Sequence, residues 1–298
     1  MQAAVIINPI SGADDHRSAA RARVERADAA MRAHGVAAEI LVTERRGHGR
    51  ELADELVRRG VRLIVAWGGD GTINEIASAL IHTPTALAIV PSGSGNGLAV
   101  ELGIARRPED AIAAALHGVE RRIDAGELGG HLFFNLAGVG FDARIARVFN
   151  QRAGARRGAL PYFAIGLREV WRYVPARYRL TFDRAPSLEC RALLVVFANG
   201  RRYGGRASTV ATSARLDDGL LDVLVVDQRS RAAQLWRARY LVAGRPDRAP
   251  GVSAYRIAQG SIESDAPMEY HVDGEWGVGG PRLDARVHAG ALLIRAPA

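Results

Sequence analysis

The feature that most constrains the fold is an apolar run that leads directly into a cluster of glycines. Residues 61–67 have the length and composition of a buried β-strand, and the sequence GGDG follows at residues 68–71. Three glycines in four positions let the backbone approach a ligand closely, because none of them carries a Cβ atom. The helical pattern that starts at Ile73 would offer unpaired N–H groups and a positive dipole end to an anion. This segment predicts a phosphate-binding turn that also carries one carboxylate, Asp70.

Apolar runs and helical patterns alternate through the first third of the chain. Strands separated by helices are typical of βαβ units, in which a parallel sheet carries helices on both faces. The expected strands cover residues 3–7, 38–42, 61–67 and 86–90, and the expected helices cover residues 17–34, 49–59, 73–81 and 108–116. The N-terminal part is therefore predicted to be an α/β domain.

From about residue 123 the pattern changes to short alternating runs with turn residues between them, which is typical of antiparallel β-structure. The expected strands cover residues 122–128, 131–137, 178–182, 191–198, 221–226, 254–258, 261–263, 268–272 and 292–295. Helices are expected at residues 143–149, 161–173 and 231–243. We place a domain boundary near Asp124.

Two further loops have the composition of ligand-binding turns. Residues 91–99 follow the fourth strand, and the first strand is followed by Asn8, Pro9, Ile10, Ser11 and Gly12. Ligands of open α/β sheets bind beyond the carboxyl ends of the strands, so we expect all three loops at one edge. Glycines and hydroxyls on such loops indicate a phosphorylated ligand, a nucleotide. Their spacing does not match the dinucleotide fingerprint, which disfavours a nicotinamide cofactor.

Charge and composition narrow the chemistry. All 40 basic residues other than histidine are Arg, which excludes a Walker A lysine and Schiff-base chemistry on lysine. A net charge of +8 favours acidic partners such as nucleotides or anionic lipid surfaces, and no nucleic-acid-binding module accompanies it. No apolar run approaches the roughly 20 residues of a membrane-spanning helix. Because the N-terminal residues also lack the features of a signal peptide, we expect a cytoplasmic protein.

Seven short motifs occur in order along the chain, at residues 8–12, 68–75, 91–99, 135–143, 199–205, 216–222 and 271–275. Together they resemble the diacylglycerol kinase catalytic family of lipid kinases, a family of soluble bacterial enzymes related to sphingosine and ceramide kinases. The GGDGT element alone is shared with NAD kinases, so the ordered set carries the resemblance. It covers nearly the whole chain.

The resemblance implies a nucleotide-binding α/β domain over residues 1–124, joined by the returning residues 287–298, and a β-sandwich lipid-substrate domain over residues 125–286. It also implies ATP as phosphoryl donor and Mg²⁺ as cofactor. The residues carried over by position as ATP contacts are Asn8, Pro9, Ile10, Ser11, Gly12, Thr43, Gly68, Gly69, Asp70, Gly71, Thr72, Ile73, Asn74, Glu75 and Ser94.

A structural Mg²⁺ in bacterial relatives would map to Arg215, Asp218 and Leu220, of which only Asp218 must supply a side chain. Paired aspartates before a strand suit an oxygen-loving cation and are also typical of a turn. We therefore keep both interpretations of this segment.

The resemblance also implies a carboxylate near the acceptor hydroxyl as general base, either Glu275 or Asp273. Asp70 competes for that role, because some relatives assign it to the aspartate of the GGD element. We favour Glu275 as base and Asp70 as partner of a metal or a hydroxyl, and the choice stays open. Independently of the resemblance, Asp273 and Gly274 between two strands predict a type I′ hairpin turn.

Residues 144–179 are rich in arginine interleaved with aromatic residues. This composition is typical of a surface that docks on an anionic membrane, and equally of a solvated helical face with aromatics in the core. The expected partners are ATP, a lipid acceptor and, peripherally, an anionic membrane, with no nucleic acid. The expected location is the cytoplasm, with transient binding at the inner membrane surface. A homodimer is allowed but not required by the sequence.

The predicted function is phosphorylation of a hydroxyl of diacylglycerol, a sphingoid base or a ceramide-like lipid, in phospholipid biosynthesis, with ATP and Mg²⁺. Two alternatives stay open: an NAD kinase-like enzyme and a non-catalytic nucleotide- or lipid-binding regulator. An NAD kinase would not explain residues 8–12 together with residues 216–222. The presence of Asp70, Asp218 and Glu275 argues against a non-catalytic regulator.

Overall fold

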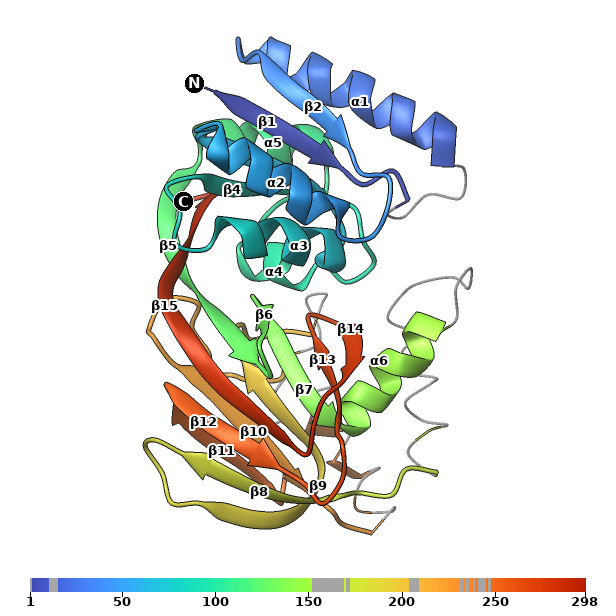
Figure 1. The fold of residues 1–298 in the computed structure, drawn as a ribbon, viewed down its shortest axis with the longest axis vertical. Coiled ribbons are helices and arrows are strands. Elements are labelled where there is room, and N and C mark those ends of the chain that lie inside the picture. The colour runs from blue at the N-terminus through green and yellow to red at the C-terminus, as the bar shows by residue number, and fades with distance from the viewer. Residues whose placement is uncertain are drawn as a thin grey trace. The chain divides into compact units, whose positions relative to one another are not determined.

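A computed structural model describes residues 2–10, 16–151, 169, 172–203, 209–230, 233, 236–237, 239–240, 245 and 248–298 of the chain. The chain divides into two compact units (Figure 1). Unit 1 comprises Met1–Ile123 and Gly290–Ala298, and unit 2 comprises Asp124–Ala289. Two strands carry the chain from one unit to the other, β5 (Val119–Leu128) and β15 (Arg282–Ala296).

Unit 1 is built on a parallel sheet in the order β2-β1-β3-β4. Its strands are β1 (Ala3–Ile7), β2 (Ala38–Val42), β3 (Leu63–Gly68) and β4 (Ala86–Pro91). Every residue of β1, β3 and β4 is buried, because helices cover both faces of a parallel sheet and leave no side of these strands to water. The last part of β15 also lies parallel to β4, with Ile294 opposite Leu87.

The helices of unit 1 are α1 (His16–Ala33), α2 (His48–Arg58), α3 (Asp70–Leu80), α4 (Gly97–Glu101) and α5 (Pro108–His117). Helices α1 and α5 pack against alternate residues of the sheet strands in one apolar cluster, and α2 packs against α3. The predicted N-terminal α/β domain is confirmed.

Helix α3 begins three residues earlier than the sequence pattern predicted, at Asp70 rather than Ile73. The N–H of Ile73 donates to the carbonyl of Gly69 over 3.0 Å, which closes the first helical turn around Asp70 and Gly71. The apolar period starts only at Ile73 because the residues of the first turn lie at the sheet edge instead of in the core. The glycine cluster is therefore partly helical.

Unit 2 consists of two antiparallel layers. One layer contains β5, β15, β6 (His131–Phe133), β8 (Arg177–Phe182) and β12 (Gln259–Glu263). The other contains β7 (Leu136–Gly140), β9 (Leu188–Ala198), β10 (Leu221–Asp227), β11 (Val252–Ile257), β13 (Glu269–Val272) and β14 (Glu275–Val278). Helix α6 (Phe141–Gln151) follows β7.

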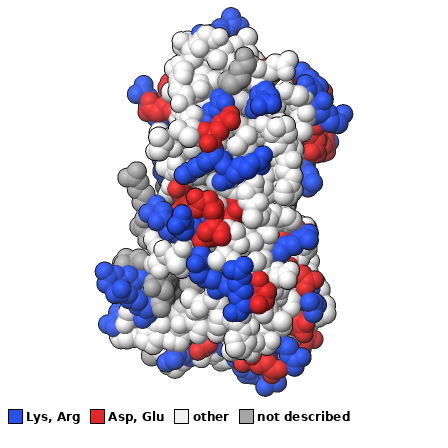
Figure 2. Space-filling view, turned by 90° about the vertical axis from the view of Figure 1, so that its left-hand side faces the viewer, with Lys and Arg blue, Asp and Glu red and all other residues white. Residues whose placement is uncertain are grey.

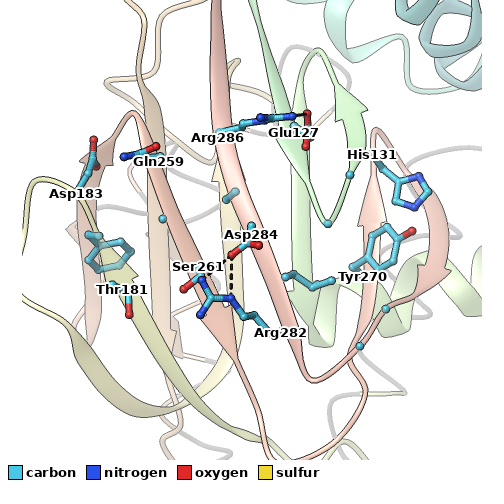
Figure 3. A pocket seen from close by; sticks show the side chains of 18 of the residues that line it. Glu127, His131, Thr181, Asp183, Gln259, Ser261, Tyr270, Arg282, Asp284 and Arg286 are labelled. Atoms are coloured by element: carbon cyan, nitrogen blue, oxygen red, sulfur yellow. Dashed lines mark hydrogen bonds and ion pairs between the residues drawn. The ribbon is translucent and has the colours of Figure 1, made fainter.

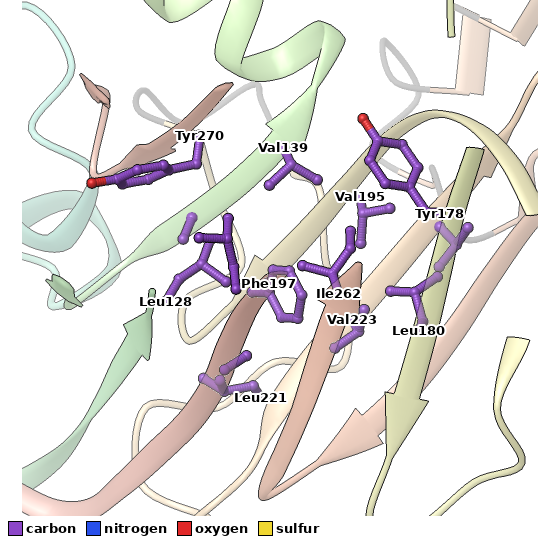
Figure 4. Packing of buried hydrophobic residues seen from close by; sticks show 14 of the residues in the cluster. Leu128, Val139, Tyr178, Leu180, Val195, Phe197, Leu221, Val223, Ile262 and Tyr270 are labelled. Atoms are coloured by element: carbon purple, nitrogen blue, oxygen red, sulfur yellow. The ribbon is translucent and has the colours of Figure 1, made fainter. Parts of the chain in front are cut away.

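The core of unit 2 lies between these layers (Figure 4). Inward-facing side chains of both layers, such as Leu180, Val195, Phe197 and Ile262, are buried there. Strand β9 belongs to both layers: Leu188 pairs with β8, whereas Ala198 pairs with β7 and β10. The predicted C-terminal β-sandwich is confirmed.

Strand β15 is longer than predicted. The sequence indicated a strand only at residues 292–295, whereas β15 covers Arg282–Ala296. Its first half alternates between exposed and buried residues and carries charged side chains, so its apolar signal is weak. Most of the helix predicted at residues 161–173 and parts of the one at residues 231–243 lie outside the described residues. No helix in the described ranges is both long and apolar enough to cross a membrane.

Candidate functional site

The three predicted ligand loops of unit 1 lie at one edge of its sheet. Parallel pairing puts Ile7 opposite Trp67 and Gly68 opposite Pro91, so the chain leaves β1, β3 and β4 at the same level. The N–H of Asn8 donates to the carbonyl of Trp67 over 2.9 Å, and the N–H of Ser92 donates to the carbonyl of Gly68 over 2.9 Å. This edge is the carboxyl edge at which open α/β sheets bind ligands.

Asn8 joins the loop after β1 to the start of α3. Its Nδ2 donates to Thr72 Oγ1 over 2.7 Å, and its Oδ1 accepts the N–H of Ile10 over 3.0 Å. A Cβ on Gly68 would lie 2.5 Å from the Cβ of Thr72, so the chain needs glycine there. The amide side chain of Asn8 thus fixes the loop.

Asp70 anchors the loop that follows β4. Its Oδ2 accepts the N–H of Asn96 over 2.8 Å, and its Oδ1 accepts the N–H of Gly97 over 2.7 Å, at the start of α4. Gly95 allows this approach, since a Cβ there would lie 2.7 Å from Asp70 Oδ2. Both carboxylate oxygens serve backbone donors. A role for Asp70 with a metal or hydroxyl would have to use their remaining lone pairs.

Glu75 anchors the loop that follows β2 in the same way. Its Oε1 accepts the N–H of Gly47 over 2.8 Å, and its Oε2 accepts the N–H of Gly49 over 3.2 Å. Thr43, in the same loop, is buried, and its N–H donates to the carbonyl of Ile7 over 2.9 Å. Two of the predicted ATP contacts, Asp70 and Glu75, therefore hold loops in place with carboxylates that would otherwise repel phosphate.

The other predicted ATP contacts lie at this edge with different exposures. Ile73 is buried in unit 1, so only its backbone is available to a ligand. Ser94 is exposed in the loop after β4. The partly exposed residues are Asn8, Pro9, Gly69, Asp70, Gly71, Asn74 and Glu75, and Ile10 is exposed. Ser11 and Gly12 lie outside the described residues.

Asn96 is a residue of this edge that the sequence analysis did not single out. It is buried and has a left-handed backbone with φ of 54°. Its Oδ1 accepts the N–H of Gly93 over 2.9 Å, and its Nδ2 donates to the carbonyl of Gly93 over 2.6 Å. An asparagine between two glycines is a recognisable signal for this conformation, because Asn tolerates positive φ better than most residues.

In unit 2, the predicted carboxylates lie at the hairpin between β13 and β14. Asp273 and Gly274 have φ of 47° and 87°, and Val272 is paired with Glu275, so the type I′ hairpin is confirmed. The carboxylate of Asp273 accepts three backbone N–H groups, from Phe134 and Asn135 over 2.9 Å each and from Leu136 over 3.1 Å. Asp273 therefore ties the hairpin to the segment before β7.

A buried histidine supports the same hairpin. His271 Nε2 lies 2.7 Å from Asp142 Oδ2 and 2.8 Å from the Tyr203 hydroxyl, while the N–H of Gly274 donates to His271 Nδ1 over 3.4 Å. Nε2 of His271 is therefore within hydrogen-bond distance of both a carboxylate and a hydroxyl. Gly138 makes room, since a Cβ there would lie 2.6 Å from Asp142 Oδ2. No local pattern in the sequence indicated that Asp142 and Tyr203 contact His271.

The predicted structural magnesium site lies before β10. Asp218 Oδ1 accepts the N–H of Leu220 over 3.1 Å, and Asp218 Oδ2 contacts the guanidinium of Arg256. Arg215 is exposed and pairs with Asp217. Within the described part of the chain, no group of three or more His, Cys, Asp and Glu residues could hold a metal ion. Since a metal on Asp218 would have to displace Arg256, the side chains as arranged do not fit Mg²⁺ at this position.

One cavity of about 880 Å³ lies over β8, β12 and β15 of unit 2 (Figure 3). Four of its charged side chains pair with one another: Arg282 with Asp284 over 2.8 Å, and Arg286 with Glu127 over 2.8 Å. None of the predicted site residues lines it. We do not assign this cavity to the candidate site.

The basic and aromatic segment at residues 144–179 is described only in part. Arg144 pairs with Glu169 over 3.2 Å, Arg147 pairs with Glu269, and Tyr173 packs in an apolar cluster with Phe141. Figure 2 shows arginines interspersed with carboxylates over the face that it draws. The described arginines at the start of the segment are therefore ion-paired, which supports the interpretation as a structured face over that of a free basic patch.

Comparison with known proteins gives one consistent pattern. Residues 2–128 match the model of the diacylglycerol kinase catalytic domain, and residues 135–295 match that of the YegS C-terminal NAD kinase beta sandwich-like domain. A Chromohalobacter salexigens protein named "Probable lipid kinase YegS-like" is 31% identical over 94% of this chain and 91% of its own length. A Pseudomonas aeruginosa protein of the same name is 31% identical over 95% and 92%.

A solved structure of a diacylglycerol kinase from Bacillus anthracis has the same fold. It superposes with a TM-score of 0.74 at 21% sequence identity, covering 99% of this chain and 96% of that one. The two-part architecture is therefore shared along the full length of the chain.

Proposed function

Because the chain belongs to the diacylglycerol kinase-like family of lipid kinases, we propose that it transfers the γ-phosphoryl group of ATP to a hydroxyl of diacylglycerol or a related lipid. The observation that carries this proposal is the set of loops at the carboxyl edge of the unit 1 sheet. Asp70 and Glu75 fix those loops through backbone N–H groups. An edge organised in this way can present backbone donors to phosphate without a lysine.

Unit 1 is the proposed nucleotide-binding part. The first turn of α3, at Asp70, Gly71 and Thr72, has N–H groups without intrahelical partners and carries the positive end of the helix dipole. These are the features that bind phosphate at helix N-termini. The full proposed set is the one carried over from the family resemblance, including Ser11 and Gly12, which rest on the sequence only.

Unit 2 is the proposed lipid-substrate part, with Glu275 as general base. The carboxylate of Asp273 accepts three backbone N–H groups, and that of Asp70 accepts two. Each of these two residues therefore has a structural role. Glu275 begins β14, is partly exposed, and is carried on a hairpin held by Asp273 and His271. Its position suits a carboxylate that must meet a substrate.

In the proposed reaction, the oxygen of the lipid hydroxyl forms a bond to the γ-phosphorus. The carboxylate of Glu275 accepts the proton that this hydroxyl loses. The bond from the γ-phosphorus to the β,γ-bridging oxygen breaks, and ADP leaves. A positioned base of this kind typically contributes about 10² to 10⁴-fold in rate. Mg²⁺ bound with ATP would neutralise charge on the phosphates. We propose that this reaction takes place in the cytoplasm, transiently at the inner membrane surface, and serves phospholipid biosynthesis.

The test is phosphoryl transfer from radiolabelled ATP with Mg²⁺ to a panel of acceptors: diacylglycerol, a monoacylglycerol, a sphingoid base, a ceramide and NAD. We expect a labelled lipid and no labelled NADP. Labelled NADP alone would favour the NAD kinase-like alternative. Binding of ATP with no labelled product would favour the non-catalytic alternative.

The variant Glu275→Gln tests the base. We expect a loss of about 10² to 10⁴-fold in turnover with ATP affinity and unfolding temperature nearly unchanged, because the substitution removes the proton acceptor and keeps the shape. Glu189→Gln is the matched control, since Glu189 is exposed on β9 and pairs only with the exposed Arg179 among the described contacts. Turnover retained in Glu275→Gln but lost in Asp70→Asn, with the ATP affinity of Asp70→Asn unchanged, would transfer the role to Asp70.

A further inference from the structure

Three carboxylates surround the turn that leads into β10. The N–H of Asp124 donates to the carbonyl of Leu216 over 2.6 Å, and Asp124 Oδ2 accepts the N–H of Gly219 over 2.7 Å. Asp218 Oδ1 accepts the N–H of Leu220, and Asp222 Oδ1 accepts the hydroxyl of Ser213. Two of these carboxylates therefore accept backbone N–H groups of the turn, and the third accepts the hydroxyl of Ser213.

This arrangement buries negative charge. Asp124 and Asp222 are 2% and 1% exposed, and the side chain of Asp218 is 17% exposed. Asp222 Oδ2 has no hydrogen-bond partner within the described part of the chain. Removal from water penalises the charged form of a buried carboxylate, and a cation close by offsets part of that cost.

Among the described contacts, the cation that lies next to Asp218 and Asp222 is Arg256. Strand pairing fixes its position, because Arg256 on β11 lies directly opposite Asp222 on β10 in an antiparallel register. Its Nη2 contacts Asp218 Oδ2, and its Nε lies 3.8 Å from Asp222 Oδ2. One guanidinium therefore lies between the carboxylate of the turn and the carboxylate of the strand.

We propose that Arg256 takes the place of a structural metal ion in this chain and that residues 215–222 keep their conformation without bound Mg²⁺. The guanidinium contacts the one side chain, Asp218, that the family resemblance assigns to the metal. It is attached to the chain, so its local concentration does not depend on the solution. Mg²⁺ would have to give up tightly held water and find near-octahedral oxygen ligands to displace it. The proposal concerns this position only and is independent of the Mg²⁺ that accompanies ATP.

The proposal is tested by thermal unfolding of the full chain without nucleotide, in millimolar Mg²⁺ and in EDTA. The wild-type chain is expected to unfold at the same temperature in both. Arg256→Gln is expected to unfold about 2–4 °C lower in EDTA, because Asp218 and Asp222 lose their common cation, and to recover in Mg²⁺. The double variant Arg256→Gln with Asp218→Asn should not respond to Mg²⁺.

Two controls keep the outcome decisive. Arg282→Gln removes an exposed arginine that also bridges two carboxylates, Glu263 and Asp284, and should change neither the unfolding temperature appreciably nor its response to Mg²⁺. Arg256→Lys keeps a positive charge, so its unfolding temperature should not respond to Mg²⁺. This variant replaces Arg256→Gln in the test if Arg256→Gln does not fold. A saturable rise of the wild-type unfolding temperature with Mg²⁺ that Asp218→Asn abolishes would overturn the proposal.

Discussion

At the scale of single residues, three carboxylates with predicted functional roles accept hydrogen bonds from backbone N–H groups. Asp70, Glu75 and Asp273 each accept two or three backbone N–H groups from segments far away in the sequence. A carboxylate is suited to this because hydrogen bonds to a charged acceptor are stronger than neutral ones. Residues that look catalytic in sequence can therefore act by fixing the loops around the chemistry.

Asp273→Asn should separate the structural role from the catalytic one. The substitution removes the charge that serves the N–H groups of Phe134, Asn135 and Leu136, so we expect a loss of roughly 1.5–3 kcal/mol in the free energy of unfolding, measured in urea. Glu275→Gln should show no such loss. The exposed Asp265→Asn is the control. Equal stability of Asp273→Asn and that control would contradict the anchoring role.

At the scale of elements, the loops after β3 and β4 form one structure. Asp70 in α3 bonds to the start of α4, and Asn96 folds back on Gly93. Gly93 lies directly against the glycine cluster: a Cβ there would lie 2.7 Å from the Cα of Gly69, a backbone atom that cannot swing away. Glycine is required at this position for the contact between two backbones.

Gly93→Ala should therefore weaken nucleotide binding and lower stability together. Overpacking of this kind costs about 1–3 kcal/mol, and the strain falls where the proposed phosphate contacts lie. ATP binding by calorimetry and thermal unfolding measure the two effects. Gly280→Ala is the control, because its Cβ would meet only atoms 3.8 Å or more away. If Gly93→Ala and Gly280→Ala had the same ATP affinity and unfolding temperature, the close contact between Gly93 and Gly69 would not be required.

At the scale of the whole molecule, the C-terminal residues belong to unit 1, although all of residues 124–289 lie between them and the rest of that unit. Ala291, Leu292, Ile294 and Ala296 are buried there, and Ile294 lies opposite Leu87 of β4. The α/β unit therefore includes a segment that is distant in sequence from its other residues. Its stability depends on residues 290–298 as well as on residues 1–123.

Ile294→Ala should destabilise unit 1 by about 2–5 kcal/mol, because a fully buried side chain is lost and a cavity remains beside β4. Thermal unfolding of the full chain measures the effect. Leu293→Ala, one residue away and only partly buried, is the control and should cost less. A smaller effect at Ile294 than at Leu293 would contradict the packing of this strand.

Much of the fold follows from local pattern. The strands of unit 1 and most strands of unit 2 were predictable within a few residues, because glycines, prolines and apolar periods mark them. The start of α3 and the first half of β15 were not, since the turn at Asp70 and the charged alternation after Arg282 carry little apolar signal. The contacts of His271 could not be predicted, because Tyr203 lies 68 positions and Asp142 lies 129 positions away in the sequence.

The sequence by itself determined the order of elements, the three glycine-bearing loops and the set of motifs that identify the family. Those features are local or depend on order alone. Only the tertiary structure decided what each acidic side chain contacts: Asp70 meets Asn96, Asp273 meets Phe134, and Asp218 meets Arg256. The reason is physical. A carboxylate binds whatever donor the packing and strand register bring within about 3 Å, and that partner is set by the fold, not by neighbours in the chain.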